Sequence, residues 1–149
     1  MTAPRRRLAV PWHRQRNAVC VPRSSLVLLL QIGSVSFLFT GDIEEAVELR
    51  LIEPDSRHDT LVLKVAHHGS ITSTSRGFLE WADPELAIVS GEASDLHADV
   101  VQNLTIAGVP FFVTDWSRTV VVKTDGESVW VSSCTLLGSA PICGPGQGN

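Results

Sequence analysis

Apolar and polar positions follow one another along the chain in an order that predicts a layered α/β structure. Two apolar runs between Ser25 and Phe39, separated by Gly33-Ser34, predict a β-hairpin. Its first arm is wholly apolar, so we expect a central strand there. Apolar residues from Ile43 to Ile52 have helical spacing. Leu61 to Val65 is apolar except for one lysine, which is typical of a strand buried on both faces.

The alternation of strands and helices continues through the second half of the chain and ends in short strands. We expect the last three strands to form a small antiparallel sheet, with Asp125-Gly126 as a hairpin turn. The predicted elements are a helix at Arg76 to Ala82, a strand at Pro84 to Ser90, a helix at His97 to Ala107, and strands at Pro110 to Thr114, Thr119 to Thr124 and Ser128 to Ser132.

Charge and composition separate the two ends of the chain from its middle. Residues 1 to 23 carry half of the 12 basic residues and no acidic one. We expect a disordered basic leader there, with a phosphate-contacting arm as the alternative. Residues 24 to 132 form the predicted domain, and residues 133 to 149, rich in Gly and Pro, predict a flexible tail. The domain is acidic, which disfavours nucleic-acid binding without metal ions or another basic domain.

Polar side chains with metal-binding chemistry follow two of the predicted strands. Thr40-Gly41-Asp42 follows the hairpin, and His67-His68-Gly69-Ser70 follows the buried strand. Open α/β sheets place their ligands at such strand ends, and imidazole and carboxylate groups bind divalent metals. The sequence therefore predicts a metal-binding sheet edge with Asp42, His67 and His68 as ligands.

The same residues allow a second interpretation without metal. Asp42 stands where the N-cap of the following helix is expected, and Glu45 three residues later completes an acidic capping box. The histidine pair would then be a polar remnant, and the chain a non-catalytic α/β domain.

Together, the two motifs resemble the metallo-β-lactamase-like domain of ComEC-type competence proteins. The resemblance covers about residues 24 to 131. It implies the C-terminal half of an αββα sandwich with zinc or manganese at the sheet edge. Asp42 would bridge two ions and His67 would bind one of them, with His68 as neighbour or alternative. It rests on Ser25-Leu26-Val27-Leu28, Phe37 to Asp42, Leu63 to Ser70, Pro84 to Ser90 and Thr114-Asp115.

The resemblance also implies a role. Such proteins act at the bacterial inner membrane in the uptake of transforming DNA, and their soluble domain is a metal-dependent hydrolase thought to be a nuclease. The family's His-x-His-x-Asp-His motif and its transmembrane region do not occur among the 149 residues. We therefore expect a fragment that is soluble, cytoplasmic if expressed alone, and inactive until the N-terminal half of the domain is supplied. DNA and that missing half would be its partners, and it would reach the membrane only through segments it lacks.

Two geometric expectations follow. The Asp42 carboxylate should lie within roughly 4 to 6 Å of the His67 or His68 imidazole, because metal–ligand bonds are near 2 Å. Apolar residues of the hairpin, at residues 25 to 30 or 37 to 39, should form an unusually large exposed patch where the missing half would pack.

Overall fold

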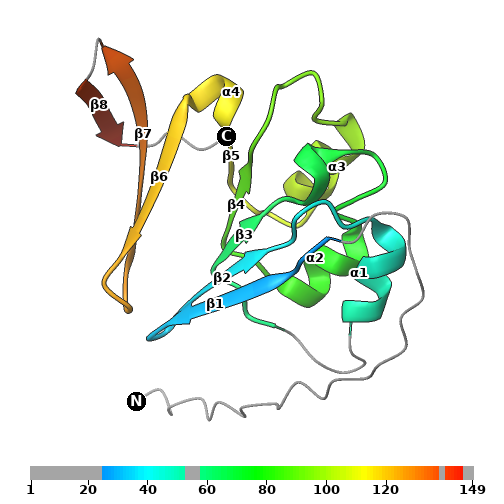
Figure 1. Ribbon diagram of the computed structural model, residues 1–149. Helices are drawn as coiled ribbons and strands as arrows, with labels where there is room; N and C mark the ends of the chain where they lie inside the picture. The colour runs from blue at the N-terminus through cyan, green and yellow to red at the C-terminus, as the bar shows by residue number, and fades with distance from the viewer. Residues whose placement is uncertain (1–24, 53–57, 138–139, 146–149) are drawn as a thin grey trace.

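A computed structural model describes residues 25–52, 58–137 and 140–145 of the chain. Its main sheet has five strands in the order β1-β2-β3-β4-β5, with β1 and β2 antiparallel and the other neighbours parallel (Figure 1). This confirms the mixed α/β prediction. The strands are β1 (Leu28–Ile32), β2 (Val35–Phe39), β3 (Val62–Lys64), β4 (Leu86–Val89) and β5 (Phe111–Val113).

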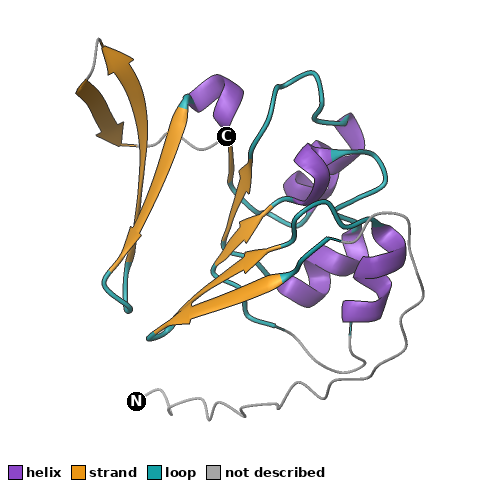
Figure 2. Cartoon of the chain, viewed as in Figure 1, coloured by secondary structure: helices purple, strands orange, loops and turns teal. Residues whose placement is uncertain are grey.

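Three helices cover one face of this sheet (Figure 2). They are α1 (Glu45–Leu51), α2 (Arg76–Ala82) and α3 (Ala98–Ile106), and each lies in a connection between two parallel strands. A 3-10 segment, η1 (Ala66–Gly69), and a short helix, α4 (Thr114–Ser117), follow β3 and β5. Parallel neighbours need such crossovers because the chain must return to the same end of the sheet before the next strand begins.

The hydrophobic core lies between the sheet and these helices. The register places Leu38, Leu63 and Ala87 side by side on the helix-facing side, and all three are buried. Phe78 from α2 and Leu104 from α3 are fully buried against them. Burying a large side chain such as Phe78 or Leu104 contributes about 1.5 to 3 kcal/mol, so this layer is a major source of stability.

A second sheet stands apart from α1, α2 and α3, beyond the opposite face of the main sheet (Figure 1). It consists of β6 (Thr119–Thr124), β7 (Val129–Leu137) and β8 (Ala140–Pro145), all antiparallel. The turn between β6 and β7 meets the β1–β2 turn, where the Ser34 N–H donates to the Gly126 carbonyl at 2.6 Å. Gly126 has a φ of +95°, a value that suits glycine.

Two predicted strand positions are wrong. The strand predicted at Pro110 to Thr114 belongs to the main parallel sheet, where Ala87 of β4 pairs with Phe111. Its run of three buried residues is typical of such a strand. The first arm of the hairpin, β1, is an edge strand and not a central one. Both faces of β1 are apolar. An edge strand of this kind has the same sequence pattern as a central strand, so periodicity alone could not distinguish the two.

The C-terminal residues also differ from the prediction. We expected residues 133 to 149 to form a flexible tail, whereas the structure places residues 133 to 137 in β7 and residues 140 to 145 in β8. Pro141 and Pro145 are compatible with β8 because it is an edge strand, where a missing N–H costs little. The predicted leader, residues 1 to 23, lies outside the described residues.

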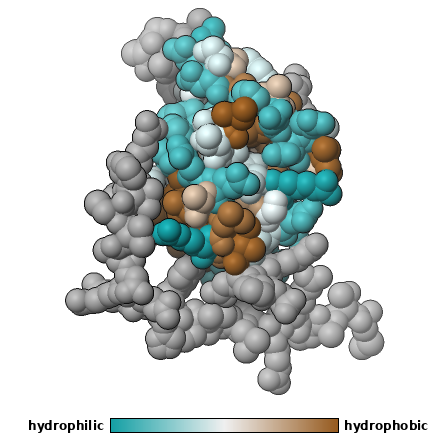
Figure 3. Space-filling model, turned by 90° about the vertical axis from the view of Figure 1, so that its right-hand side faces the viewer, coloured by the Kyte–Doolittle hydropathy of each residue, from teal (hydrophilic) through white to brown (hydrophobic). Residues whose placement is uncertain are grey.

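The face of the hairpin that points away from the helices is apolar and exposed. Cross-strand pairing places Leu28 beside Phe39 and Leu30 beside Phe37 on this face. Leu28 is 50% exposed, Leu30 42% and Phe39 39%, as the expectation of an exposed hairpin patch requires. On the side of the molecule turned toward the viewer in Figure 3, by contrast, apolar patches are interrupted by polar residues. We call Leu28, Leu30, Ile32, Phe37 and Phe39 the hairpin apolar face.

A buried carboxylate joins α1 to the start of α2. Glu48 is fully buried, and its oxygens accept hydrogen bonds from the backbone N–H groups of Thr74, at 2.5 Å, and Ser75, at 2.9 Å. The Asn103 side chain from α3 donates to the Thr74 carbonyl at 3.2 Å. Three helices therefore converge on the loop that follows the histidine pair.

We predict that Glu48→Ala lowers the free energy of unfolding by about 2 to 4 kcal/mol, because two buried N–H groups lose a charged acceptor. Urea denaturation of the purified chain measures this. Glu45→Ala, on the exposed side of the same helix, is the matched control and should change stability by no more than about 0.5 kcal/mol. Equal losses in the two variants would contradict the role given to Glu48.

Candidate functional site

The two sequence motifs lie side by side because they follow adjacent parallel strands. Asp42 comes three residues after β2, and His67 and His68 lie in η1, directly after β3. Two hydrogen bonds tie the segments together. The buried Thr40 hydroxyl donates to the Lys64 carbonyl at 2.6 Å, and the His67 N–H donates to the Gly41 carbonyl at 3.0 Å. The relative position of the motifs is therefore fixed by one side-chain and one backbone hydrogen bond.

Both histidines have an unusual backbone conformation. His67 has φ of +47° and His68 has φ of +57°, in the left-handed region that non-glycine residues rarely adopt. Such positions cost of order 1 kcal/mol or more each and are enriched at functional sites. Gly69, the next residue, lies so close to the Leu96 side chain that an added Cβ would be only 2.4 Å from it. The turn formed by His67, His68 and Gly69 is therefore tight. Its two imidazoles face different partners.

The His68 ring lies between Asp42 and the end of β4. Its Nδ1 is 2.5 Å from the Ser90 carbonyl oxygen, and its Nε2 is 4.0 Å from Asp42 Oδ1. A carbonyl can only accept, so Nδ1 must carry the proton in the neutral ring. Nε2 then has a lone pair facing the Asp42 carboxylate. The expected proximity of Asp42 to one of the histidines is therefore present, and the histidine is His68.

The His67 ring points elsewhere. Its Nδ1 lies 3.8 Å from Glu44 Oε1, and this nitrogen is buried with no hydrogen-bond partner among the described residues. Glu44 was missed at the sequence level. The usable signal was its position two residues after Asp42, in the same connection between β2 and α1.

Asp42 does not cap α1, so the capping interpretation is wrong. The helix starts at Glu45 with Glu44 as the N-cap residue, and no side chain makes a capping hydrogen bond there. The helix begins two residues later than a capping box with Asp42 would require, so Asp42 lies outside the helix end. Its own N–H donates to the Ser25 hydroxyl at 2.7 Å. The Asp42 side chain is 56% exposed and beside His68, so its carboxylate is available to a ligand.

Lys64 adds a positive charge to this edge of the sheet. Its Nζ donates to the Val65 carbonyl at 2.9 Å. Burial lowers the pKa of Lys64 below the ordinary value of 10.5, and the nearby negative charge of Asp42 partly opposes that effect. The charge balance at the site therefore depends on Asp42 and Lys64 together.

The loop after β4 completes the surroundings of His68. Gly91 lies against the His68 ring, and its N–H donates to the Thr114 hydroxyl at 3.0 Å. The Ala93 N–H donates to the Asp115 carboxylate at 3.2 Å. Thr114 and Asp115 of α4 thus hold the loop that positions His68. These contacts are a structural explanation for the Thr-Asp pair after β5.

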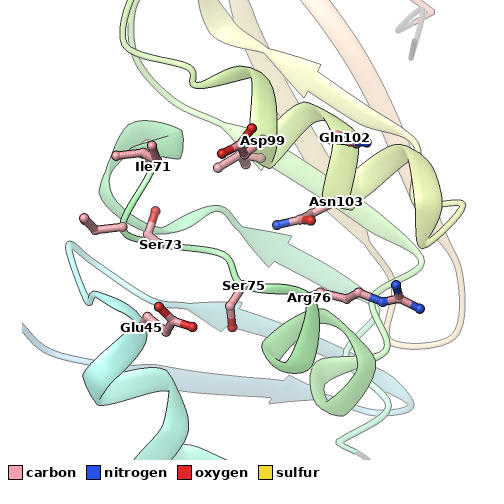
Figure 4. Close-up of a pocket in the computed structure, with 10 residues that line it drawn as sticks. Glu45, Ile71, Ser73, Ser75, Arg76, Asp99, Gln102 and Asn103 are labelled. Atoms are coloured by element: carbon pink, nitrogen blue, oxygen red, sulfur yellow. The ribbon is translucent and has the colours of Figure 1, made fainter.

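A shallow polar pocket lies on the helix side of the molecule (Figure 4). It contains none of Asp42, His67 and His68, and its one arginine, Arg76, is already paired with Glu80 at 2.9 Å. We assign no chemistry to it. The residues that line it are Glu45, Ile71, Thr72, Ser73, Ser75, Arg76, Asp99, Val100, Gln102 and Asn103.

Among the described residues, two candidate metal ligands, Asp42 and His68, lie beside each other, and His67 and Glu44 lie close by. Within the described part of the chain, no group of three or more His, Cys, Asp and Glu residues is arranged to hold a metal ion. His97 accepts a hydrogen bond from the Asp99 N–H at the start of α3, and His58 stacks on Trp81, so both have structural contacts. The part of the chain that the structure describes contains no helix long and apolar enough to cross a membrane.

Comparison with characterised proteins identifies relatives of one kind. The chain is 35% identical over 103 residues to ComE operon protein 3 of Bacillus subtilis, 42% over 66 residues to Recombination protein 2 of Haemophilus influenzae, and 34% over 98 residues to Competence protein ComA of Neisseria gonorrhoeae. The chain is homologous to ComEC-type competence proteins. The resemblance drawn from the two motifs is thereby confirmed.

The matches to these competence proteins cover 65%, 44% and 62% of the chain but only 13%, 8% and 14% of the relatives. The chain therefore spans a small part of the length of the ComEC-type proteins that it matches. No protein-family model matches it, and no solved structure matches it. The metallo-β-lactamase-like sandwich accordingly stays a prediction.

We predict that Asp42→Asn lowers the pKa of Lys64 further, because it removes the charge that opposes the effect of burial. NMR titration of the Lys64 side chain measures this directly. The unfolded chain binds this proton more tightly than the folded one. The free energy of unfolding should therefore rise with pH from the folded-state pKa of Lys64 up to 10.5, its value in the unfolded chain.

Lys64→Met should abolish this part of the pH dependence, whereas Lys123→Met, at an exposed position of β6, should leave it unchanged. Urea denaturation between pH 8 and pH 10.5 makes the comparison. If Lys64→Met keeps the pH dependence of the wild-type chain, another titrating group causes it.

Proposed function

We propose that the chain is part of a metal-dependent hydrolase domain, a nuclease that acts during the uptake of transforming DNA. One observation carries this proposal: the Asp42 carboxylate and the His68 Nε2 lone pair meet at one edge of the sheet, 4.0 Å apart. Ligands of a single zinc ion lie roughly 3 to 3.5 Å apart, so a small side-chain movement suffices. Homology to competence proteins supports the biological role.

The residues present fit a divalent metal such as zinc or manganese. A metal-binding histidine usually donates its other ring N–H to a carbonyl or carboxylate, and His68 has that arrangement with Ser90. Asp42 and His68 would hold the ion, and His67, whose ring faces Glu44 in this structure, would supply a further nitrogen once the site is completed. A bound divalent ion acidifies water and neutralises charge that develops on a phosphodiester. Lys64 adds a further positive charge to this edge.

We further propose that the N-terminal half of the domain packs on the hairpin apolar face and completes the metal site. Zinc takes four ligands, of which Asp42 and His68 supply two. Leu28, Leu30 and Phe39 remain 39 to 50% exposed, which is unusual for a contiguous set of large apolar side chains. The layers of helices, main sheet and second sheet agree with part of an αββα sandwich, and the longer ComEC-type relatives have room for the rest.

The first test measures zinc or manganese binding by isothermal titration calorimetry. We expect weak binding by the 149-residue chain, lost in Asp42→Ala and in His68→Ala and retained in Glu45→Ala. We also expect no metal-dependent cleavage of single-stranded DNA above background, because an ion with few protein ligands does not fix a water for in-line attack. Robust cleavage by this chain would show that it holds more of the catalytic groups than we assign.

The second test restores the upstream half, by fusing the corresponding region of ComE operon protein 3 to residues 24 to 149. Cleavage should appear in this fusion and should be abolished by Asp42→Ala, His67→Ala or His68→Ala. An active fusion that tolerates Asp42→Ala would overturn the metal assignment and favour a non-catalytic α/β domain for this part of the protein.

We predict that the isolated chain binds a hydrophobic fluorescent dye or self-associates through the hairpin apolar face. Leu28→Lys with Leu30→Lys should reduce dye binding severalfold and should also prevent activation by the upstream half. Leu49→Lys is the matched control, because Leu49 is 63% exposed but lies on α1, on the helix side. If Leu49→Lys has the same effect, or the double variant has none, the upstream half packs elsewhere.

A further inference from the structure

The His67 imidazole has one nitrogen that needs a partner. Nδ1 is buried and makes no hydrogen bond within the described residues, although the side chain as a whole is 24% exposed. The exposed part of the ring therefore lies away from Nδ1. An unpaired buried polar atom is costly, so a nearby acceptor has a strong effect on which nitrogen carries the proton.

Glu44 is placed to be that acceptor. Its Oε1 lies 3.8 Å from His67 Nδ1, about 1 Å longer than a charge-assisted hydrogen bond, and a change of one side-chain torsion can close this gap. The Glu44 backbone is fixed, because its carbonyl accepts from the N–H groups of Val47 and Glu48 at the start of α1. Its carboxylate makes no capping hydrogen bond and so is not committed to the helix.

We propose that Glu44 is a positioning residue for His67. The carboxylate accepts the Nδ1 proton, which holds the neutral ring in the Nδ1–H tautomer and leaves the lone pair on Nε2. This proposal deepens the proposed function and rests on it for its purpose, because a metal ligand needs an unprotonated nitrogen. The tautomer itself does not depend on metal.

The consequence is that the two histidines share one protonation pattern with different acceptors. His68 donates Nδ1–H to the Ser90 carbonyl, and His67 donates it to the Glu44 carboxylate. Both would then present Nε2 as the ligand nitrogen. Without Glu44, no other described residue would favour this tautomer of His67, and the other tautomer would become populated.

The test is NMR of the 149-residue chain labelled with nitrogen-15 at histidine, without metal, at a pH well above the ordinary imidazole pKa of about 6.5. Long-range proton–nitrogen correlations distinguish the two tautomers, and His67→Gln assigns the signals. In the wild-type chain we expect Nδ1–H to predominate at both His67 and His68. Glu44→Leu should shift His67 toward Nε2–H, whereas Glu44→Gln, which keeps an acceptor oxygen, should largely restore Nδ1–H.

Two controls separate positioning from loss of structure. His68 is an internal reference, because its acceptor is a backbone carbonyl, and its tautomer should stay the same in every folded variant. Glu45→Leu removes the adjacent carboxylate and should leave His67 unchanged. A wild-type His67 in the Nε2–H form, or a His67 unaffected by Glu44→Leu while His68 is preserved, would overturn the proposal.

Metal affinity provides a second measurement in the fusion with the upstream half. Loss of a carboxylate that orients a ligating histidine typically weakens metal binding 10- to 100-fold, so we expect about that loss for Glu44→Leu and a smaller one for Glu44→Gln. Unchanged affinity in both variants would contradict the positioning role. If the wild-type fusion binds no metal, the proposed function fails, while the tautomer result still decides whether Glu44 positions His67.

Discussion

The site depends on two hydrogen bonds that join the ends of β2 and β3. The Thr40 hydroxyl bonds to the Lys64 carbonyl, and the His67 N–H bonds to the Gly41 carbonyl, so the segment carrying Asp42 and the segment carrying the histidines move as one unit. These bonds form because the strands are adjacent and parallel, which brings their carboxyl ends to the same edge. Without that pairing, residues more than twenty positions apart would have no reason to meet.

From this fixed edge, the left-handed backbone at His67 and His68 separates the two rings. One ring reaches Ser90 and Asp42, and the other reaches Glu44. The strain at these two positions is maintained by the surrounding contacts, which include the loop that Thr114 holds against His68. Glu48 and Asn103 fix the loop that follows, so the helix layer also contributes to the geometry.

Sequence patterns predicted the elements well where one physical signal dominated. The hairpin, the buried strand at residues 61 to 65 and the alternating helices follow from periodicity, and the adjacency of Asp42 and a histidine follows from parallel strand ends. Patterns failed where two causes produce the same sequence. An apolar strand can be central or can be an edge with two apolar faces, as β1 is, and an Asp before a helix can cap it or extend away. Glu44 was missed because a carboxylate near a helix start has an ordinary explanation.

The exposed apolar face and the candidate site are physically connected. Phe39 is the last residue of β2, three residues before Asp42, and it pairs in register with Lys64. Any segment that covers Phe39 must therefore come close to both Asp42 and Lys64. Covering that face would remove Lys64 further from water, which is costly for a charged amine unless a negative partner stays beside it. Asp42 already contributes that negative charge, and a phosphodiester bound at the same edge would add to it. Under the proposed function, an anion bound at this edge would offset the cost of removing the Lys64 charge from water, so covering the apolar face and binding the anion would favour each other.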